Sequence, residues 1–94
     1  MSNYIITQYS YDKAKQLNLI IKQSKNKGKK IDVYTINNDF LHSIGDIRYN
    51  DYPSYLLIYN KQYADERKRL YNIRHQKNIN IVNSKQYLSA NLLW

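Results

Sequence analysis

Short runs of β-branched and aromatic residues, separated by polar turn residues, dominate the first half of the chain. They predict strands at 3–9 (NYIITQY), at 19–24 (LIIKQS), and at 31–36 and 40–45. The last two runs flank an Asn-Asn-Asp turn and should pair as a β-hairpin. The lysine-rich segment 25–30 (KNKGKK) supplies the turn that precedes this hairpin, with Gly28 as its permissive residue.

Helical signals lie on either side of these strands. Ser10 is a suitable N-cap for a short helix over about 11–18. Pro53 suits the first turn of a later helix. The negative charge of Asp51, just ahead of it, would stabilise the positive end of the helix dipole. Beyond it, apolar residues recur at three-, four- and seven-residue spacings, which is a helical stripe: Tyr55, Leu56, Tyr59, Tyr63, Leu70 and Ile73. One helix of about 25 residues, or two helices joined near Asn60, would account for this stripe.

The C-terminal segment predicts a further strand and a last helix. Residues 79–82 (INIV) form a short apolar run that predicts an edge strand. Ser84 can cap a helix that runs toward the terminal Trp94, and the indole should dock on the core. The whole pattern predicts a single α+β domain over 1–94. Its small antiparallel sheet is built on the central β-hairpin, with a long basic amphipathic helix and a short C-terminal helix packed on it.

The charge of the chain favours an anionic partner. Fifteen Lys and Arg against seven Asp and Glu give a net charge of +8. Residues 1–50 and residues 51–94 each contribute +4, so the charge is not a basic tail on a neutral domain. A charge of this size also serves solubility. In addition, the abundance of Asn, Ile, Lys and Tyr is typical of AT-rich coding sequences, which can raise the lysine content without selection for binding.

The sequence contains no cysteine, which excludes thiol catalysis, disulfides and thiolate zinc sites. The N-terminus has no basic segment followed by a long apolar run, so we expect no signal peptide and no secretion. No apolar run approaches the ~18 residues of a membrane helix, so we expect no membrane partner.

The stretch 63–75 (YADERKRLYNIRH) is the most informative part of the sequence. At about 100° per residue, the apolar side of the predicted helix contains Tyr63, Ala64, Leu70, Tyr71 and Ile73. Two arginines, Arg67 and Arg74, fall within this apolar arc. Lys68 and Arg69 fall opposite it and are expected in solvent, where Asp65 can pair with Arg69 at i,i+4.

Arg67 and Arg74 need a counter-charge or an exit to solvent, because arginine is rarely buried without a partner. Three interpretations are open. The side chains can extend past the aromatics to water, they can meet a carboxylate of this chain (Asp32, Asp46 or Asp51), or they can face the phosphate of a partner.

The sequence contains one weak candidate for a catalytic site. Arg67, Tyr71 and His75 share one edge of the predicted helix and could act on a phosphodiester. However, no convergent set of carboxylates for a metal is apparent, and the two glycines are isolated rather than part of a phosphate loop. We therefore predict a protein that is not an enzyme and uses no cofactor and no metal, with a small nuclease kept as the third hypothesis.

Several of these segments together resemble a family of small basic, uncharacterised proteins of large DNA viruses (mimivirus-like and phycodnavirus-like) and of some phages. The resemblance covers about 25–94 and rests on KGKKIDV, a hairpin that ends in SIG, YNDYPSY, ERKRLYNIRH and the terminal LLW. The chain departs from the family near 78–91, where a further Trp and an Ala-Gly turn are expected. The resemblance implies a viral origin, a location in the host cytoplasm, the host nucleus or the virion, and no catalytic residue.

The leading hypothesis is a non-enzymatic nucleic-acid-binding protein that contacts the phosphate backbone with weak sequence specificity, with DNA favoured over RNA. The residues expected to contact phosphates are Lys25, Lys27, Lys29, Lys30, Arg48, Arg67, Arg74, His75 and Lys77. The alternative is a structural virion component or protein-interaction module without nucleic-acid affinity, which binds an acidic protein surface, associates with itself or assembles into a virion.

Overall fold

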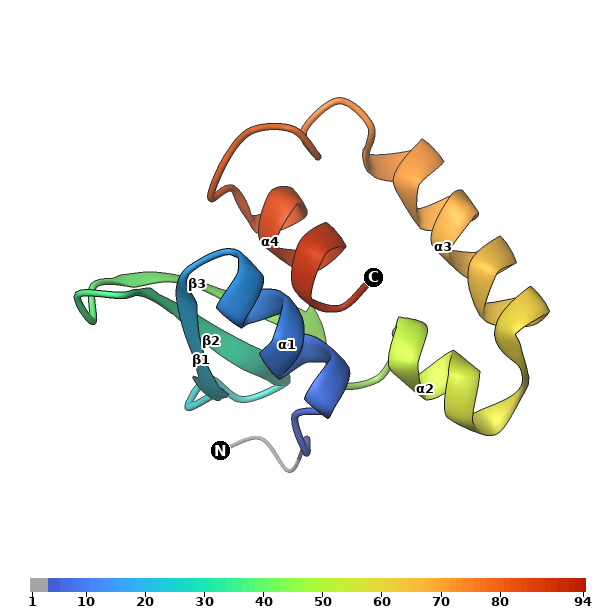
Figure 1. The fold of residues 1–94 in the computed structure, drawn as a ribbon, viewed down its shortest axis with the longest axis horizontal. Coiled ribbons are helices and arrows are strands. Elements are labelled where there is room, and N and C mark those ends of the chain that lie inside the picture. Colours follow the sequence, from blue (N-terminus) through green and yellow to red (C-terminus); the bar gives the residue numbers. More distant parts are fainter. Residues whose placement is uncertain (1–3) are drawn as a thin grey trace.

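The computed structural model describes residues 4–94, which form a three-stranded sheet and four helices (Figure 1). The fold is α+β, as the sequence predicts. In chain order the elements are α1 (Gln8–Gln16), β1 (Leu19–Gln23), β2 (Lys29–Thr35), β3 (Phe40–Asp46), α2 (Tyr52–Ile58), α3 (Lys61–His75) and α4 (Lys85–Leu92).

The sheet is an antiparallel meander with the order β1-β2-β3. The predicted strands at 19–24, 31–36 and 40–45 are confirmed, and β2 and β3 form the predicted hairpin. Asn38 adopts a left-handed φ of 69° in the turn of this hairpin, a conformation that asparagine tolerates better than most residues. The lysine-rich segment is confirmed as the turn between β1 and β2, where Gly28 has a φ of 84°.

The core lies between the sheet and the pair α1 and α4 (Figure 1). Ile31, Val33 and Ile44 of the hairpin are fully or almost fully buried, and so are Leu88 and Leu92 of α4. Burial of a leucine or isoleucine side chain contributes about 1.5–3 kcal/mol, so these five side chains supply much of the driving force for folding. The C-terminal helix therefore docks on the sheet, as predicted.

Capping side chains set the helix boundaries in the second half of the chain. Asp51 caps α2 by accepting the N–H of Ser54 at 3.0 Å, and Ser84 caps α4 by accepting the N–H of Tyr87 at 3.1 Å, both at the predicted positions. Asn60 accepts the N–H of Tyr63 at 2.8 Å and starts a new helix. Of the two alternatives for this region, two helices joined near Asn60 is correct.

Three local predictions are wrong. The first is the strand 3–9: residues 4–7 are not a strand, and residue 3 lies outside the described residues. The second is the N-cap of α1, which begins at Gln8 and is capped by Thr7 instead of Ser10. The predicted edge strand 79–82 is a series of turns in which Ile81 and Val82 are exposed. Both segments have a β-type composition, but neither pairs with a strand of the sheet, and without such pairing their backbone has no ladder to join.

The apolar side of α3 also differs from the predicted stripe. Leu70 and Ile73 are exposed, whereas Ala64 is fully buried and Tyr71 is 8% exposed. Helix α3 lies against α2 and α4, so it contacts the body of the protein along the narrow line of Ala64 and Tyr71. This narrow contact leaves room for a cavity on each side of α3.

Candidate functional site

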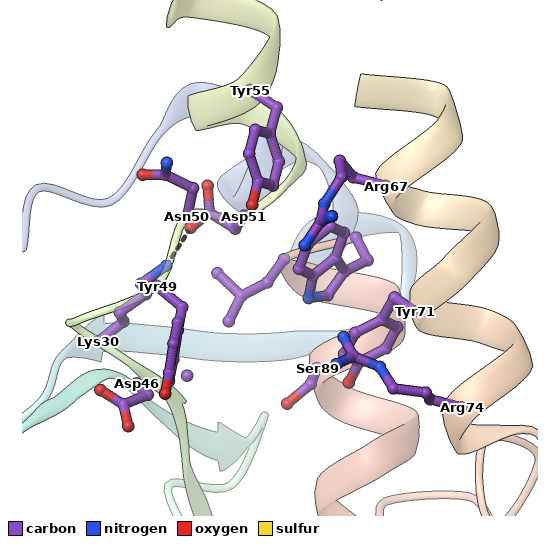
Figure 2. A pocket seen from close by; sticks show the side chains of 13 residues that line it. Lys30, Asp46, Tyr49, Asn50, Asp51, Tyr55, Arg67, Tyr71, Arg74 and Ser89 are labelled. Atoms are coloured by element: carbon purple, nitrogen blue, oxygen red, sulfur yellow. Dashed lines mark hydrogen bonds and ion pairs between the residues drawn. The ribbon is translucent and has the colours of Figure 1, made fainter. Parts of the chain in front are cut away.

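A cleft of about 450 Å³ lies between α3 and the segment that joins β3 to α2. Figure 2 shows Arg67 and Arg74 extending from α3 into this cleft, opposite Lys30, Tyr49 and Asn50. We call it the arginine cleft, and its lining consists of Lys30, Gly45, Asp46, Tyr49, Asn50, Asp51, Tyr55, Arg67, Tyr71, Arg74, Ser89, Leu93 and Trp94. Its volume is in the range typical of sites for small organic molecules.

Arg67 and Arg74 point into the cleft because they occupy equivalent positions on the helix. Each stands three residues after a residue of the buried line, Ala64 and Tyr71 respectively. The guanidinium of Arg67 lies 5.6 Å from the ring centroid of Tyr55, which is a cation–π distance. Among residues 4–94, neither arginine has a carboxylate within 4 Å.

Asp51 is one of the three carboxylates considered for these arginines, and it is held by Lys30 instead. The ammonium of Lys30 lies 2.9 Å from Oδ2 of Asp51, and the two side chains are 4% and 1% exposed. Tyr4 donates a second hydrogen bond to the same oxygen at 2.8 Å. Burial alone would raise the pKa of Asp51. However, the charge and the hydrogen bond of Lys30, together with the hydrogen bonds from Ser54 and Tyr4, hold this pKa below its ordinary value.

Asp46 and Asp32 are also engaged elsewhere. Arg48 forms a two-pronged pair with Asp46, with its closest contact at 2.7 Å, and its hydrogen bonds lower the pKa of that carboxyl to about 2. Asp32 accepts hydrogen bonds from the hydroxyls of Ser24 and Ser43, each at 2.5 Å. The interpretation in which Arg67 and Arg74 meet a carboxylate of this chain is therefore wrong.

Aromatic rings form the inner wall of the cleft. The indole of Trp94 stacks on the ring of Tyr71 with a centroid distance of 4.7 Å and an interplanar angle of 15°, and it also contacts Tyr55 at 6.0 Å. The predicted docking of Trp94 is thus confirmed. Burial raises the pKa of the Tyr71 hydroxyl, although a hydrogen bond with Ser89 and the charge of Arg74 act in the opposite direction. The charge of Arg74 therefore acts at this inner wall.

The outward face of α3 carries its own ion pairs, and these differ from the predicted one. Asp65 accepts hydrogen bonds from Lys61 at 2.6 Å and from the hydroxyl of Tyr52 at 2.7 Å. Arg69 pairs with Glu66 at 2.5 Å. The predicted Asp65–Arg69 pair is wrong, because Asp65 turns toward α2 and leaves Arg69 to the acid three residues before it.

The structure separates the predicted phosphate contacts into groups. Lys30, Arg67 and Arg74 line the arginine cleft, but Lys30 is 3% exposed and bound to Asp51, so its prediction as a phosphate contact is wrong. Arg48 is exposed at the rim, beside Tyr49, with its guanidinium paired to Asp46. The remaining predicted contacts are exposed or half-buried and do not line the cleft: Lys25, Lys27, Lys29, His75 and Lys77.

Two of these remaining groups still lie close to the cleft. The turn that carries Lys25 and Lys27 is joined to the segment after β3 by a hydrogen bond from the N–H of Ile47 to the carbonyl of Gly28, at 3.0 Å. The ring of His75 packs on Tyr71 at a centroid distance of 4.4 Å. The turn 25–30 and His75 thus each contact an element that borders the cleft.

The aromatic and polar residues of the opposite wall were not among the predicted contacts. Tyr49 is 66% exposed, and Asn50 next to it is also exposed. Both stand in the short polar segment between the hairpin and the Asp-capped α2, a position where loops often carry function. That position is the only signal that could have indicated them, because nothing local in the sequence shows that α3 lies across from this loop.

Residues 4–94 contain neither a metal-ligand cluster nor a helix able to cross a membrane. In the described part of the chain, no group of three or more His, Asp or Glu side chains is placed to hold a metal ion. None of the helices between residues 4 and 94 is both long and apolar enough to span a bilayer.

Comparison with known proteins adds no relative. No family model matches the chain, and neither the curated proteins nor the solved structures gave a match. The resemblance to viral proteins therefore stays a hypothesis, and function has to be argued from the cleft itself.

Proposed function

We propose that this protein binds nucleic acid without catalysis, and that the arginine cleft holds one phosphate-bearing unit of an unpaired strand. The observation that carries the proposal is that Arg67 and Arg74 face the cleft with no carboxylate of residues 4–94 within ion-pair distance. The charged groups around them are already neutralised in pairs, Lys30 with Asp51 and Arg48 with Asp46. The two arginines are therefore the uncompensated charge of the cleft.

The aromatic side chains favour an unpaired strand over a duplex. Tyr49 is exposed at the rim and Trp94 lines the wall, so a base could stack beside the bound phosphate. A cavity of about 450 Å³ has the size of a small-molecule site and not the width of a double helix. Contacts of this kind are made to phosphates and ring faces, which explains why weak sequence specificity is expected.

The viral context remains part of the proposal and rests on the resemblance alone. DNA is kept as the favoured nucleic acid, and host cytoplasm, host nucleus or virion as the location.

The test is a titration of fluorescently labelled single strands and duplexes at two salt concentrations. If about 4–6 phosphates are neutralised, log K should fall with log salt with a slope of about −3 to −5, and single strands should bind more tightly than duplexes. The double variant R67Q/R74Q should reduce the steepness of this slope by about 0.7 on single strands, since it removes the neutralisation of the one phosphate held in the cleft.

Arg69→Gln is the matched control, because it removes the same charge from the same helix at a position paired with Glu66. It should leave the affinity nearly unchanged. Absence of binding at low salt by the unmodified protein would refute the proposal. A loss in R69Q about half as large as the loss in R67Q/R74Q would show that net charge, and not the cleft, attracts the nucleic acid, because the double variant removes two charges and the control removes one.

A second candidate is a self-associating module without nucleic-acid affinity. The specific observation in its favour is the run of exposed apolar side chains on α2, where Leu57 is 87% and Ile58 59% exposed. Sedimentation velocity over a range of protein concentrations tests it. Concentration-dependent dimers that are lost in Leu57→Asp, together with no binding in the titration above, would favour this candidate. A small nuclease, the third hypothesis, would be revealed by cleavage of DNA or RNA in the presence of Mg²⁺ or Mn²⁺.

A further inference from the structure

A second cavity, of about 320 Å³, lies on the other side of the buried line of α3. It shares no lining residue with the arginine cleft. We call it the lysine cavity, and it is lined by Lys13, Lys68, Asn72, Ile79, Asn80, Tyr87, Ala90 and Asn91. These residues come from α1, from α3, from the turns after α3 and from α4.

Two lysines from different helices, Lys13 and Lys68, line this cavity. The ammonium of Lys13 lies 5.2 Å from the ring centroid of Tyr9, and that of Lys68 lies 5.2 Å from the ring centroid of Tyr52. The two rings contact each other at a centroid distance of 5.4 Å. The pair of tyrosines therefore holds the two positive charges as neighbours. Lys68, expected in solvent from the sequence, is in fact half-buried.

No acidic side chain neutralises these lysines at close range. Within residues 4–94, neither ammonium has a carboxylate oxygen within 4 Å. Asp65 is the acid whose charge interacts with Lys68, but both of its oxygens are engaged, by Lys61 and by the hydroxyl of Tyr52. Two like charges thus lie near each other with no carboxylate of residues 4–94 within 4 Å, and Asp65 acts on Lys68 only from a greater distance.

This arrangement has an energetic cost. Burial, and next the charge of Lys68, lower the pKa of Lys13. An anion between the two ammonium groups would remove this repulsion and would gain charge-assisted hydrogen bonds. The side-chain amides of Asn72 and Asn80 line the same cavity and offer further N–H donors.

We propose that the lysine cavity binds the phosphate group of an organic phosphate. Lys13 and Lys68 would hold the phosphate oxygens, with Asn72 and Asn80 as additional donors. Ile79, Tyr87 and Ala90 provide an apolar wall for the organic part of the ligand. The amide N–H of Asn91 is already donated to the carbonyl of Tyr87 at 2.8 Å, so Asn91 fixes the wall and is not assigned a phosphate contact.

The phosphate can belong to a small phosphate ester or to a nucleic acid, and the experiment distinguishes these sources. Inorganic phosphate, phenyl phosphate and a single-stranded oligonucleotide are titrated separately into the full chain while the lysine ammonium resonances are followed by NMR. Saturable shifts of the Lys13 and Lys68 signals with phenyl phosphate would support a small ester. Shifts of these two signals with the oligonucleotide only would support a nucleic-acid phosphate.

The variants Lys13→Met and Lys68→Met keep the aliphatic stem and remove the charge. Each should weaken phenyl phosphate binding by about tenfold or more, because each removes a charge-assisted hydrogen bond. Lys15→Met is the matched control, since Lys15 lies on the same helix, is exposed and does not line the cavity. It should bind like the unmodified protein.

A second readout needs no ligand. Since the two lysines repel each other, Lys13→Met without phosphate should melt at the same temperature as the unmodified protein or higher. In the R67Q/R74Q background, where the arginine cleft no longer competes for phosphate, added phenyl phosphate should raise Tm only while both lysines are present. The proposal is overturned if no probe shifts the two ammonium signals, or if Lys15→Met weakens binding as much as Lys13→Met does. R67Q/R74Q should leave the binding of phenyl phosphate at the lysine cavity unchanged. The lysine cavity is therefore tested separately from the arginine cleft.

Discussion

Replacing Lys30 with methionine should destabilise this protein strongly, because it leaves the carboxylate of Asp51 buried without its counter-ion. The pair is 2.9 Å apart, and both side chains are almost inaccessible to solvent. Methionine keeps the aliphatic stem that packs near Gly45, so lost packing contributes little. The remaining effect is that of one uncompensated charge.

The magnitude follows from this burial. Removal of one partner from a buried ion pair costs about 3–5 kcal/mol, whereas a surface pair contributes about 0–1 kcal/mol. A domain of this length has a total stability of about 5–15 kcal/mol. Lys30→Met should therefore consume a large fraction of the stability and still leave a folded population at low temperature. Lys27→Met, at an exposed position of the neighbouring turn, should change the free energy of unfolding by less than about 0.5 kcal/mol.

The pH dependence gives the sign of the effect independently. In the unmodified protein the pKa of Asp51 lies below its ordinary value of 3.8, so the pair stabilises the fold above about pH 4 and this contribution is lost as the pH falls through the lowered pKa. In Lys30→Met, only the hydrogen bonds of Ser54 and Tyr4 still oppose burial, so we expect the pKa of Asp51 to rise. The difference in stability between the two proteins should then shrink as the pH falls toward 4.

Urea unfolding, followed by the fluorescence of the single Trp94 and by circular dichroism, measures these differences. The double variant K30M/D51N completes the cycle, because asparagine keeps the N-cap of α2 and removes the buried charge. It should be more stable than Lys30→Met alone. A Lys30→Met protein within 1 kcal/mol of the unmodified protein, with the same pH dependence, would refute the burial of this pair.

Two further predictions concern the end of β3. Gly45→Ala should lower the free energy of unfolding by about 1–3 kcal/mol in urea, since its Cβ would lie 2.7 Å from Cδ1 of Leu93 and its φ of 78° disfavours a side chain. The Asp46 carboxyl should titrate near a pKa of about 2 by NMR and return toward its ordinary value in Arg48→Gln, whose guanidinium hydrogen bonds cause the shift. An unchanged Asp46 titration in that variant would contradict the assigned pair.

Local signals were sufficient for the three strands of the sheet and for the starts of α2 and α4. The hairpin follows from two β-branched runs around an asparagine turn, and the starts of α2 and α4 follow from Asp51 and Ser84, whose side chains bond to N–H groups three residues ahead. Each of these features depends on residues within a few positions of one another. The local sequence is therefore enough to predict the hairpin and the starts of these two helices.

The two wrong strands had the composition of a strand but lacked a partner. Residues 79–82 are apolar, yet Val82 is 69% exposed in turns, because α4 and not a fourth strand continues the chain there. Residues 4–7 lead directly into α1, where Thr7 accepts the N–H of Ser10 at 3.3 Å. Strand formation depends on pairing that no single segment reveals.

The candidate site was predictable only as far as one helix. Projection of 63–75 placed Arg67 and Arg74 on one side of the helix, and both line the arginine cleft, although Arg67 is half-buried and Arg74 is exposed. The projection could not show that Asp51 forms an ion pair with Lys30, or that Lys13 lies near Lys68. These interactions join residues that are 21 and 55 positions apart in the sequence. Long-range contacts, and not helix geometry, decide which cations are left without a partner.

The distribution of acids along α3 distinguishes charge for binding from charge for solubility. The outward cations Lys61 and Arg69 each have an acid on the same helix, at a position where water would screen them in any case. Arg67 and Lys68 are half-buried beside the two cavities, where a lone positive charge is more costly. Within residues 4–94, neither has an acid in ion-pair contact. Selection for stability alone would favour the reverse placement. The two acids on α3 lie away from the cavities, which is the pattern expected if anions from outside the chain neutralise the inward cations.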